Sequence, residues 1–181
     1  QLYQRPVMFG EIGLNRNVPA SLDADLVNFH QQNWIGLMGG GAGTGANWFW
    51  TLLDNVNGYW DYQVVSEMAA HIPWNDAGMV MVDTRNVSPS DSAVEVQGYR
   101  GADYAYLWLY DSRFSQINKA VTTFDNLTLS VRLGDGVYHV RWIDTWTGVS
   151  LGKSVAAAAD GYLTLTAPAW GKDIAVAITR D

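Results

Sequence analysis

The chain has 181 residues, of which 48% are hydrophobic and 16% are charged, a composition typical of a folded globular protein. Its net charge of −7 and the absence of any basic run argue against a nucleic acid partner, because phosphate binding needs clustered Lys and Arg. There is no cysteine, which excludes disulfides and thiolate metal sites and is compatible with secretion as well as with the cytoplasm. No apolar run approaches the roughly 20 residues that cross a bilayer, so no membrane partner is expected.

The aromatic content is high, with nine Trp and nine Tyr. Flat aromatic rings cover the apolar C–H face of sugars, so this excess favours a carbohydrate-binding protein. An aromatic-rich β-sandwich core would account for the same composition.

Residues 6–13 form a short apolar run that ends on a single carboxylate, Glu11, with Gly10 and Gly13 close by. We expect a strand that delivers this acid to its C-terminal tip, where catalytic groups sit in a (β/α)₈ barrel. The alternative is a buried strand that ends in a turn, with Glu11 simply solvated. A polar loop is expected over 15–21.

Two helices and a second strand follow. Hydrophobic spacing predicts a helix over 23–38, which the glycine run 39–43 ends. Residues 44–51 are expected to form a strand with Trp48 and Trp50 on one face. A loop over 54–58 and a helix over 59–72 complete an order of strand, helix, strand and helix, which indicates parallel β/α units. On the first helix His30 and Asn33 are expected to have hydrogen-bonded core roles.

The pattern changes at Pro73. Short alternating segments separated by turn signals predict an antiparallel β-sandwich; we expect strands at 93–99, 104–110, 127–133, 137–144, 150–156, 162–166 and 174–179. Residues 75–91 are the expected linker, with an edge strand at 79–82. Four tryptophans of this region are candidates for a carbohydrate platform: Trp108, Trp142, Trp146 and Trp170. We favour core positions for Trp108 and Trp142, whereas Trp146 lies in a turn and is the better surface candidate, although it could instead pack against the barrel.

Three stretches together resemble the C-terminal portion of a retaining glycoside hydrolase, from the clan of (β/α)₈ glycosidases that includes the family 5 cellulases. Phe9-Gly10-Glu11-Ile12-Gly13 looks like the seventh barrel strand with its nucleophile. Asn33–Met38 with the glycine run and Asn47-Trp48-Phe49-Trp50 look like the seventh helix and a Trp-rich eighth strand. Gly136–Gly148 with Lys172–Val176 look like the β-sandwich appended to the barrel in some of these enzymes.

The resemblance implies roles for three residues. Glu11 would be the nucleophile, Trp50 would end the eighth strand as the floor of the sugar site, and Trp48 would lie deeper on the same face. The general acid/base of this clan is a Glu that follows an Asn, and no Asn-Glu dipeptide occurs in the chain. Asp54, Asp61, Glu67 and Glu95 fit this role poorly, and none is expected to reach Glu11.

The sequence therefore predicts α/β plus all-β architecture: residues 1–72 as the last two β/α units of a TIM barrel, and residues 73–181 as an antiparallel β-sandwich. The expected function is retaining cleavage of β-glycosidic bonds in a poly- or oligosaccharide, with Glu11 as catalytic residue and Trp48 and Trp50 binding substrate. The competing interpretation is a non-catalytic carbohydrate-binding or structural β-sandwich module on an inactive fragment, in which Glu11 is incidental. A third is a proteolytic remnant with no activity of its own.

The chain opens on Gln1 rather than Met, and we expect it to be a piece of a longer protein. The expected partners are the carbohydrate substrate and either the N-terminal portion of the barrel or a second copy of the chain. No cofactor is expected. No metal site is expected either, because His30, His71 and His139 show no ligand spacing.

Overall fold

The computed structural model describes residues 7–13 and 23–180, and it is mostly β-sheet with few helices. The N-terminal part contains two short strands and three helices: β1 (Glu11–Ile12), α1 (Val27–Met38), β2 (Ala46–Asn47), α2 (Trp50–Asn55) and α3 (Trp60–His71). The C-terminal part contains nine strands: β3 (Val80–Met81), β4 (Val87–Pro89), β5 (Val94–Arg100), β6 (Tyr104–Asp111), β7 (Thr128–Arg132), β8 (Gly136–Ile143), β9 (Ser150–Ala158), β10 (Tyr162–Thr166) and β11 (Asp173–Arg180).

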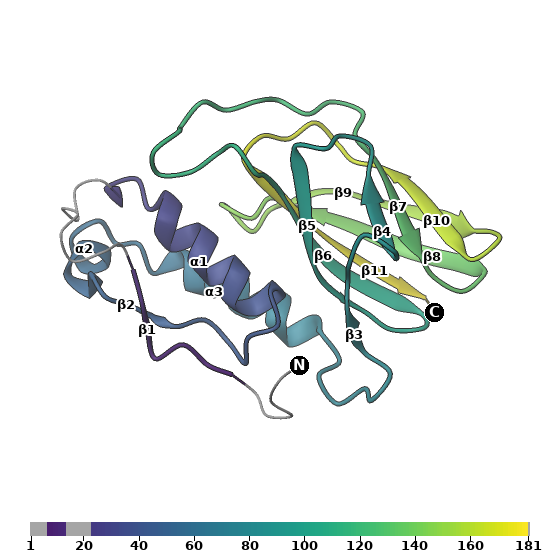
Figure 1. Cartoon of the computed structure of the whole chain (residues 1–181), viewed down its shortest axis with the longest axis horizontal. Coiled ribbons are helices and arrows are strands. Elements are labelled where there is room, and N and C mark those ends of the chain that lie inside the picture. The colour runs from purple at the N-terminus through teal and green to yellow at the C-terminus, as the bar shows by residue number, and fades with distance from the viewer. Residues whose placement is uncertain (1–6, 14–22, 181) are drawn as a thin grey trace.

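The C-terminal strands form two antiparallel sheets that pack face to face (Figure 1). The larger sheet has the order β3-β5-β6-β11-β8-β9, and the smaller has the order β10-β7-β4. Alternate residues point between the sheets, so that Leu107, Leu129 and Leu163 are fully buried in one core. The strands expected from the alternating pattern are therefore present. One strand was not expected, β4, which lies within the predicted linker.

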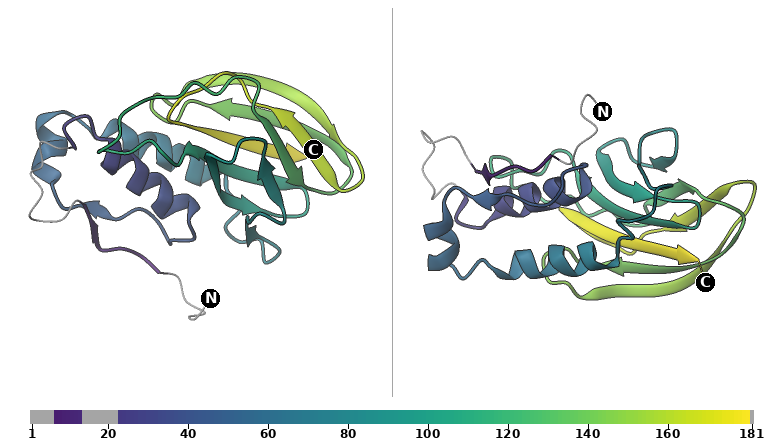
Figure 2. Two further views of the ribbon diagram at one scale, coloured as in Figure 1. Left: turned by 45° about the horizontal axis from the view of Figure 1, so that its top comes forward. Right: turned by 90° about the horizontal axis from the view of Figure 1, so that it is seen from below.

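The helices α1 and α3 cover the outer face of the larger sheet. They share a second core with it, in which Trp34 of α1 and Met68 of α3 pack with Trp108 of β6. The β1–β2 pair lies on the side of the helices away from the sandwich, as the views of Figure 2 also show. Trp108 is consequently buried, as is Trp142 in the core between the sheets, and both predicted core positions are confirmed.

Strands β1 and β2 pair in parallel, with Glu11 opposite Ala46 and Ile12 opposite Asn47, and α1 connects them. The β-α-β order predicted from the sequence is therefore present within the described residues. Both strands are much shorter than expected, and part of the strand predicted over 6–13, as well as the loop over 15–21, lies outside those residues.

The strand predicted over 44–51 is wrong at its C-terminal end, because Trp50 begins the helix α2. The side chain of Asn47 turns the chain here: its Oδ1 accepts the backbone N–H of Phe49 at 2.7 Å. The carbonyl of Phe49 then accepts the N–H of Leu52 at 2.8 Å, which starts the helical turn. The loop predicted over 54–58 accordingly loses its first residues to α2.

Candidate functional site

Glu11 and Trp48 occupy the same face of the β1–β2 pair. Glu11 is exposed and lies opposite Ala46, and along the second strand Ala46 and Trp48 are exposed while Asn47 between them is buried. Because successive side chains of a strand point to opposite faces, Trp48 extends the face that carries Glu11 by one position. The N–H of Trp48 still donates to the carbonyl of Ile12 at 2.7 Å, so this tryptophan is held against the end of β1.

Glycine at position 13 is what lets Trp48 approach β1. A Cβ on Gly13 would lie 2.9 Å from the Cβ of Trp48, a separation that two such carbons do not tolerate. Gly45 has the same role on the other strand, where a Cβ would lie 2.9 Å from the carbonyl oxygen of Phe9. Gly13 and Gly45 thus permit close contact of the two strands, whereas a Cβ on Gly10 would meet nothing within 4 Å.

Trp50 lies outside this strand pair, on the first turn of α2, and the residue is 65% exposed. The helix is anchored by Leu53, which packs against Leu26 and Phe29 of the segment that begins α1. Trp48 is 54% exposed and is therefore not interior filling within this chain. Of the two tryptophans, the structure brings Trp48 rather than Trp50 onto the face of Glu11.

The N-terminal part exposes many large apolar side chains. Three of them precede Glu11 in the chain, and the others lie around α2 and at the start of α3: Val7, Met8, Phe9, Trp48, Trp50, Tyr59 and Trp60. Soluble domains seldom leave so many large apolar groups in water without a partner or ligand to cover them.

The other acids considered in the sequence lie apart from β1. Asp54 is in α2 and Glu67 is an exposed residue of α3, where it accepts a hydrogen bond from Gln63. Glu95 is an exposed residue of β5, a strand that the helices separate from β1 (Figure 1). Asp61 is fully buried in a polar network between α1, α3 and β11.

That network centres on His30 of α1, whose ring is fully buried. Its Nδ1 is bonded to the carboxylate of Asp61 on α3, and its Nε2 lies 3.1 Å from Oδ1 of Asp173 on β11. Asn33 donates its side-chain N–H to Asp61 at 2.6 Å. Thr145 donates its hydroxyl to Asp173, which thereby gains a further partner. The expected core role of His30 and Asn33 is confirmed.

The two carboxylates keep His30 charged. Burial by itself would lower the pKa of the imidazole, but Asp173 and Asp61 raise it, and the pKa of His30 reaches about 9. His30 and Asp61 are closed to a substrate, so this ion cluster serves to join the helices to the larger sheet. Sequence reasoning found His30 but not Asp173, because 143 residues separate them and nothing local marks the pair.

Trp146 packs into the same region. Its ring stacks on His30 with the centroids 4.1 Å apart, and its Nε1–H donates to Asp173 at 3.2 Å. The Lys172 ammonium lies over the indole ring, 4.1 Å from its centroid. Of the two roles considered for Trp146, packing against the N-terminal part is therefore the one observed. Trp170 is buried against Phe124, so it forms no exposed platform.

Within residues 7–13 and 23–180, no group of three or more His, Asp or Glu is arranged to hold a metal ion. None of the helices in that part of the chain has the length and apolar character to traverse a lipid bilayer.

The sequence matches no family model and no curated protein sequence. Among solved structures the chain is similar to a glycoside hydrolase, with a TM-score of 0.57 and 12% identity over 88% of this chain and 37% of that one. It is also similar to a GH30 endoxylanase from Clostridium papyrosolvens C71, with a TM-score of 0.50 and 16% identity over 98% of this chain and 42% of that one. At these identities the likeness shows a shared fold. The chain spans about two fifths of the length of these two structures.

Proposed function

We propose that this chain is the C-terminal part of a retaining glycoside hydrolase that cleaves β-glycosidic bonds in a poly- or oligosaccharide, with Glu11 as the nucleophile. The observation that carries the proposal is the exposed carboxylate of Glu11 at the end of a parallel strand pair, with the indole of Trp48 on the same face. The fold shared with glycoside hydrolases supports it.

The chemistry needs two carboxyl groups about 5–5.5 Å apart, one to attack the anomeric carbon and one to protonate the leaving oxygen. Glu11 would attack, and water would later release the sugar from the ester so formed. The partner acid would come from the portion of the barrel that precedes this chain. The uncovered apolar side chains around β1 and α2 are where that portion, or less favourably a second copy of the chain, would pack.

Trp48 would floor the sugar site, because a ring one position along from the nucleophile can cover the C–H face of a bound sugar. Trp50 would bind substrate from the rim, given its exposed position on α2. Specificity among glycans would depend on residues of the preceding portion.

The proposal is tested on the longer polypeptide that carries this chain behind the preceding barrel segment. Glu11→Gln should lower kcat on β-linked xylan or glucan by on the order of 10³-fold or more, with KM little changed, because it removes the attacking group alone. Trp48→Ala should raise KM. Glu95→Gln, the matched change at an exposed acid on β5, should leave both constants unaltered.

The second candidate is a non-catalytic carbohydrate-binding or structural module. It is favoured by the absence of a second carboxylate beside Glu11 among the residues described. It predicts that the longer polypeptide binds glycan equally well with Glu11 or Gln at this position and hydrolyses nothing, an outcome that would refute the enzymatic proposal.

A further inference from the structure

A hollow lies on the outer face of the larger sheet, beside the end of α3. Across the sheet, one register row consists of Tyr106 on β6, Ala177 on β11, Arg141 on β8 and Lys153 on β9. Ala177 is small where its neighbours in the row are long, so the sheet surface dips between them.

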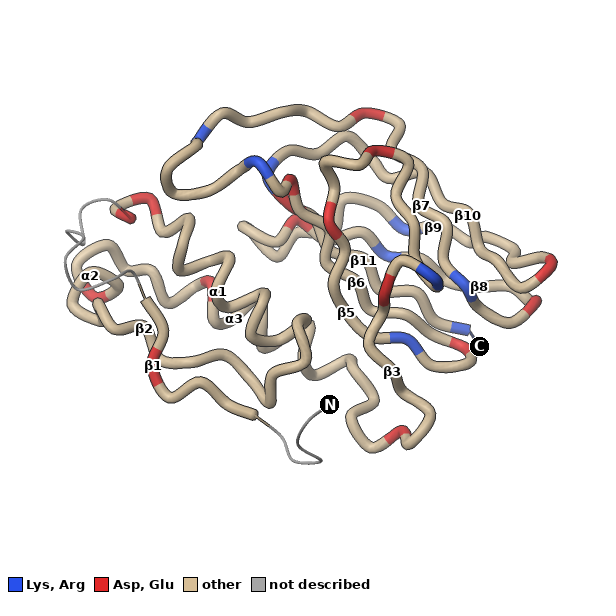
Figure 3. Tube along the Cα trace, viewed as in Figure 1, with Lys and Arg blue, Asp and Glu red and all other residues tan. Residues whose placement is uncertain are grey.

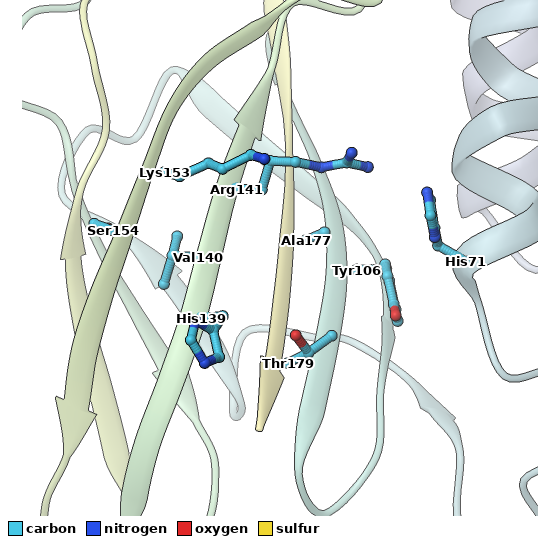
Figure 4. A pocket seen from close by; sticks show the side chains of 9 residues that line it. All are labelled: His71, Tyr106, His139, Val140, Arg141, Lys153, Ser154, Ala177 and Thr179. Carbon is cyan, nitrogen blue, oxygen red and sulfur yellow. The ribbon is translucent and has the colours of Figure 1, made fainter. Parts of the chain in front are cut away.

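Helix α3 ends beside this row, whose Tyr106 and Ala177 still belong to the core that the helices share with the sheet. The preceding row, which includes Trp108 and Ala175, is buried beneath α1 and α3. Helix α3 ends at His71, and this residue forms one wall of a cavity of about 260 Å³ whose floor is Ala177 (Figure 4). Figure 4 also shows Arg141 extending across the sheet toward the side where His71 stands.

The lining of this cavity is basic and hydroxylic. Arg141 and Lys153 contribute two cations, and hydroxyl groups come from Tyr106 and Thr179. None of the nine lining residues is an Asp or a Glu, in a chain whose net charge is −7. Figure 3 shows basic residues within the sheet strands, while most acidic residues of the sandwich lie in the connecting loops.

The two cations have no counter-ion among residues 7–13 and 23–180. Arg141 and Lys153 are directly opposite across β8 and β9, a like-charge pairing that destabilises a sheet. Neither forms an ion pair with any residue in the described part of the chain. Three other arginines do form ion pairs: Arg85 with Asp83, Arg113 with Asp111 and Arg180 with Asp103.

Among the described residues that line this hollow and the adjoining one, a single residue is acidic. Glu67 of α3 lines an adjoining hollow on the other side of Arg141, but its carboxylate accepts a hydrogen bond from Gln63 and makes no ion pair with the guanidinium. The two facing cations are therefore left available to an external anion.

We propose that this hollow binds an oxyanion group, a carboxylate or a phosphate monoester, carried on a monosaccharide-sized molecule. Arg141 presents several donors in a fixed fork that suits such oxygens, and Lys153 adds a second point charge. The volume is below the roughly 300–1,000 Å³ of pockets for drug-sized ligands, which suits a single sugar unit. The inference that the anion is part of a sugar rests on the proposed function. The inference that the hollow binds an anion does not.

The test is calorimetric titration of the full chain with four probes: glucuronate, glucose 6-phosphate, inorganic phosphate and glucose. Glucuronate or glucose 6-phosphate should bind and glucose should not, and added salt should weaken the binding. Arg141→Gln and Lys153→Gln should each weaken it by about tenfold or more, because a charge-assisted hydrogen bond is lost. Arg132→Gln, the same change on β7 of the other sheet, should have no effect.

Lys153→Glu provides a second readout. It places a carboxylate opposite Arg141, so it should abolish anion binding while raising the melting temperature. Loss of binding accompanied by a lower melting temperature would refute the claim that Arg141 and Lys153 lack a counter-ion.

Binding that survives Arg141→Gln and Lys153→Gln, an equal loss in Arg132→Gln, or failure of every anion to bind would overturn the proposal. Inorganic phosphate binding without either sugar probe would overturn its sugar part. Glu11→Gln should leave anion binding unchanged. The anion-binding proposal and the glycosidase proposal can therefore fail independently of each other.

Discussion

At the scale of single residues, the carboxylates of Glu11 and Asp61 differ in their exposure to solvent. Glu11 is exposed beside Trp48, where it can meet a substrate, whereas Asp61 is enclosed with His30. The sequence marked Glu11 by its glycines. It could not mark the partners of His30, because the contact with Asp173 exists only once α1 packs against the sheet.

The stability of the protein should fall as the pH rises through the pKa of His30. The pKa of His30 is about 9 in the fold and about 6.5 in an unfolded chain. Its contribution is therefore complete below about pH 6.5 and is lost as the pH approaches 9, with a total on the order of 2–4 kcal/mol. Urea unfolding across pH 6 to 9.5 would measure it.

His71→Gln alters an exposed histidine at the end of α3, and the free energy of unfolding of this variant should depend on pH as in the wild type. In His30→Gln this dependence on pH should be lost. A wild-type slope that is flat over this range would mean that His30 is neutral in the fold.

At the scale of elements, periodicity predicted the helix ending at His71 and strands such as β10 well, because each has one buried and one exposed face. The central strands β6 and β11 are buried on both faces, and turn signals at their ends marked them instead. It failed where local side-chain bonds decide the path. The Asn47 side chain ends β2 and starts α2, and the three-residue strand β4 with its terminal proline is too short to show alternation.

The start of α1 depends on a buried carboxylate in the same way. Asp23 accepts the N–H groups of Asn28 at 2.6 Å and Phe29 at 3.0 Å, which would otherwise lack partners. Asp23→Ala should lower the free energy of unfolding by about 1–2 kcal/mol. The neighbouring Asp25, in an exposed ion pair with Lys119, is the matched control, and its replacement by Ala should cost less than about 1 kcal/mol. Equal losses in the two variants would show that Asp23 does not cap the helix.

At the scale of the whole molecule, the two main hydrophobic cores are filled, whereas the apolar surface around β1 and α2 is left uncovered. The sandwich core and the helix-to-sheet core are closed by residues of this chain. The two-residue parallel pair cannot close a barrel, and it leaves backbone groups and rings such as Phe9 and Trp48 uncovered. The last two β/α units of a barrel thus stay a prediction that the β-α-β order supports.

The isolated 20.0 kDa chain should therefore self-associate. Every Å² of apolar surface that a neighbour covers contributes about 25 cal/mol, which favours association over exposure. Light scattering should give a mass above that of one chain, and addition of the preceding barrel segment should convert it to a one-to-one complex. A stable monomer with glycosidase activity would contradict both the barrel assignment and the need for a partner.

Covalent trapping would test most directly whether Glu11 is the nucleophile. The longer polypeptide is incubated with a 2-fluoro β-glycoside, whose ester with a nucleophilic carboxylate hydrolyses slowly, and is then digested for mass spectrometry. We predict one added sugar mass on the peptide that contains Phe9 to Gly13, at Glu11, and no label after Glu11→Gln. A label on another carboxylate in an active preparation would contradict the assignment of Glu11 as the nucleophile.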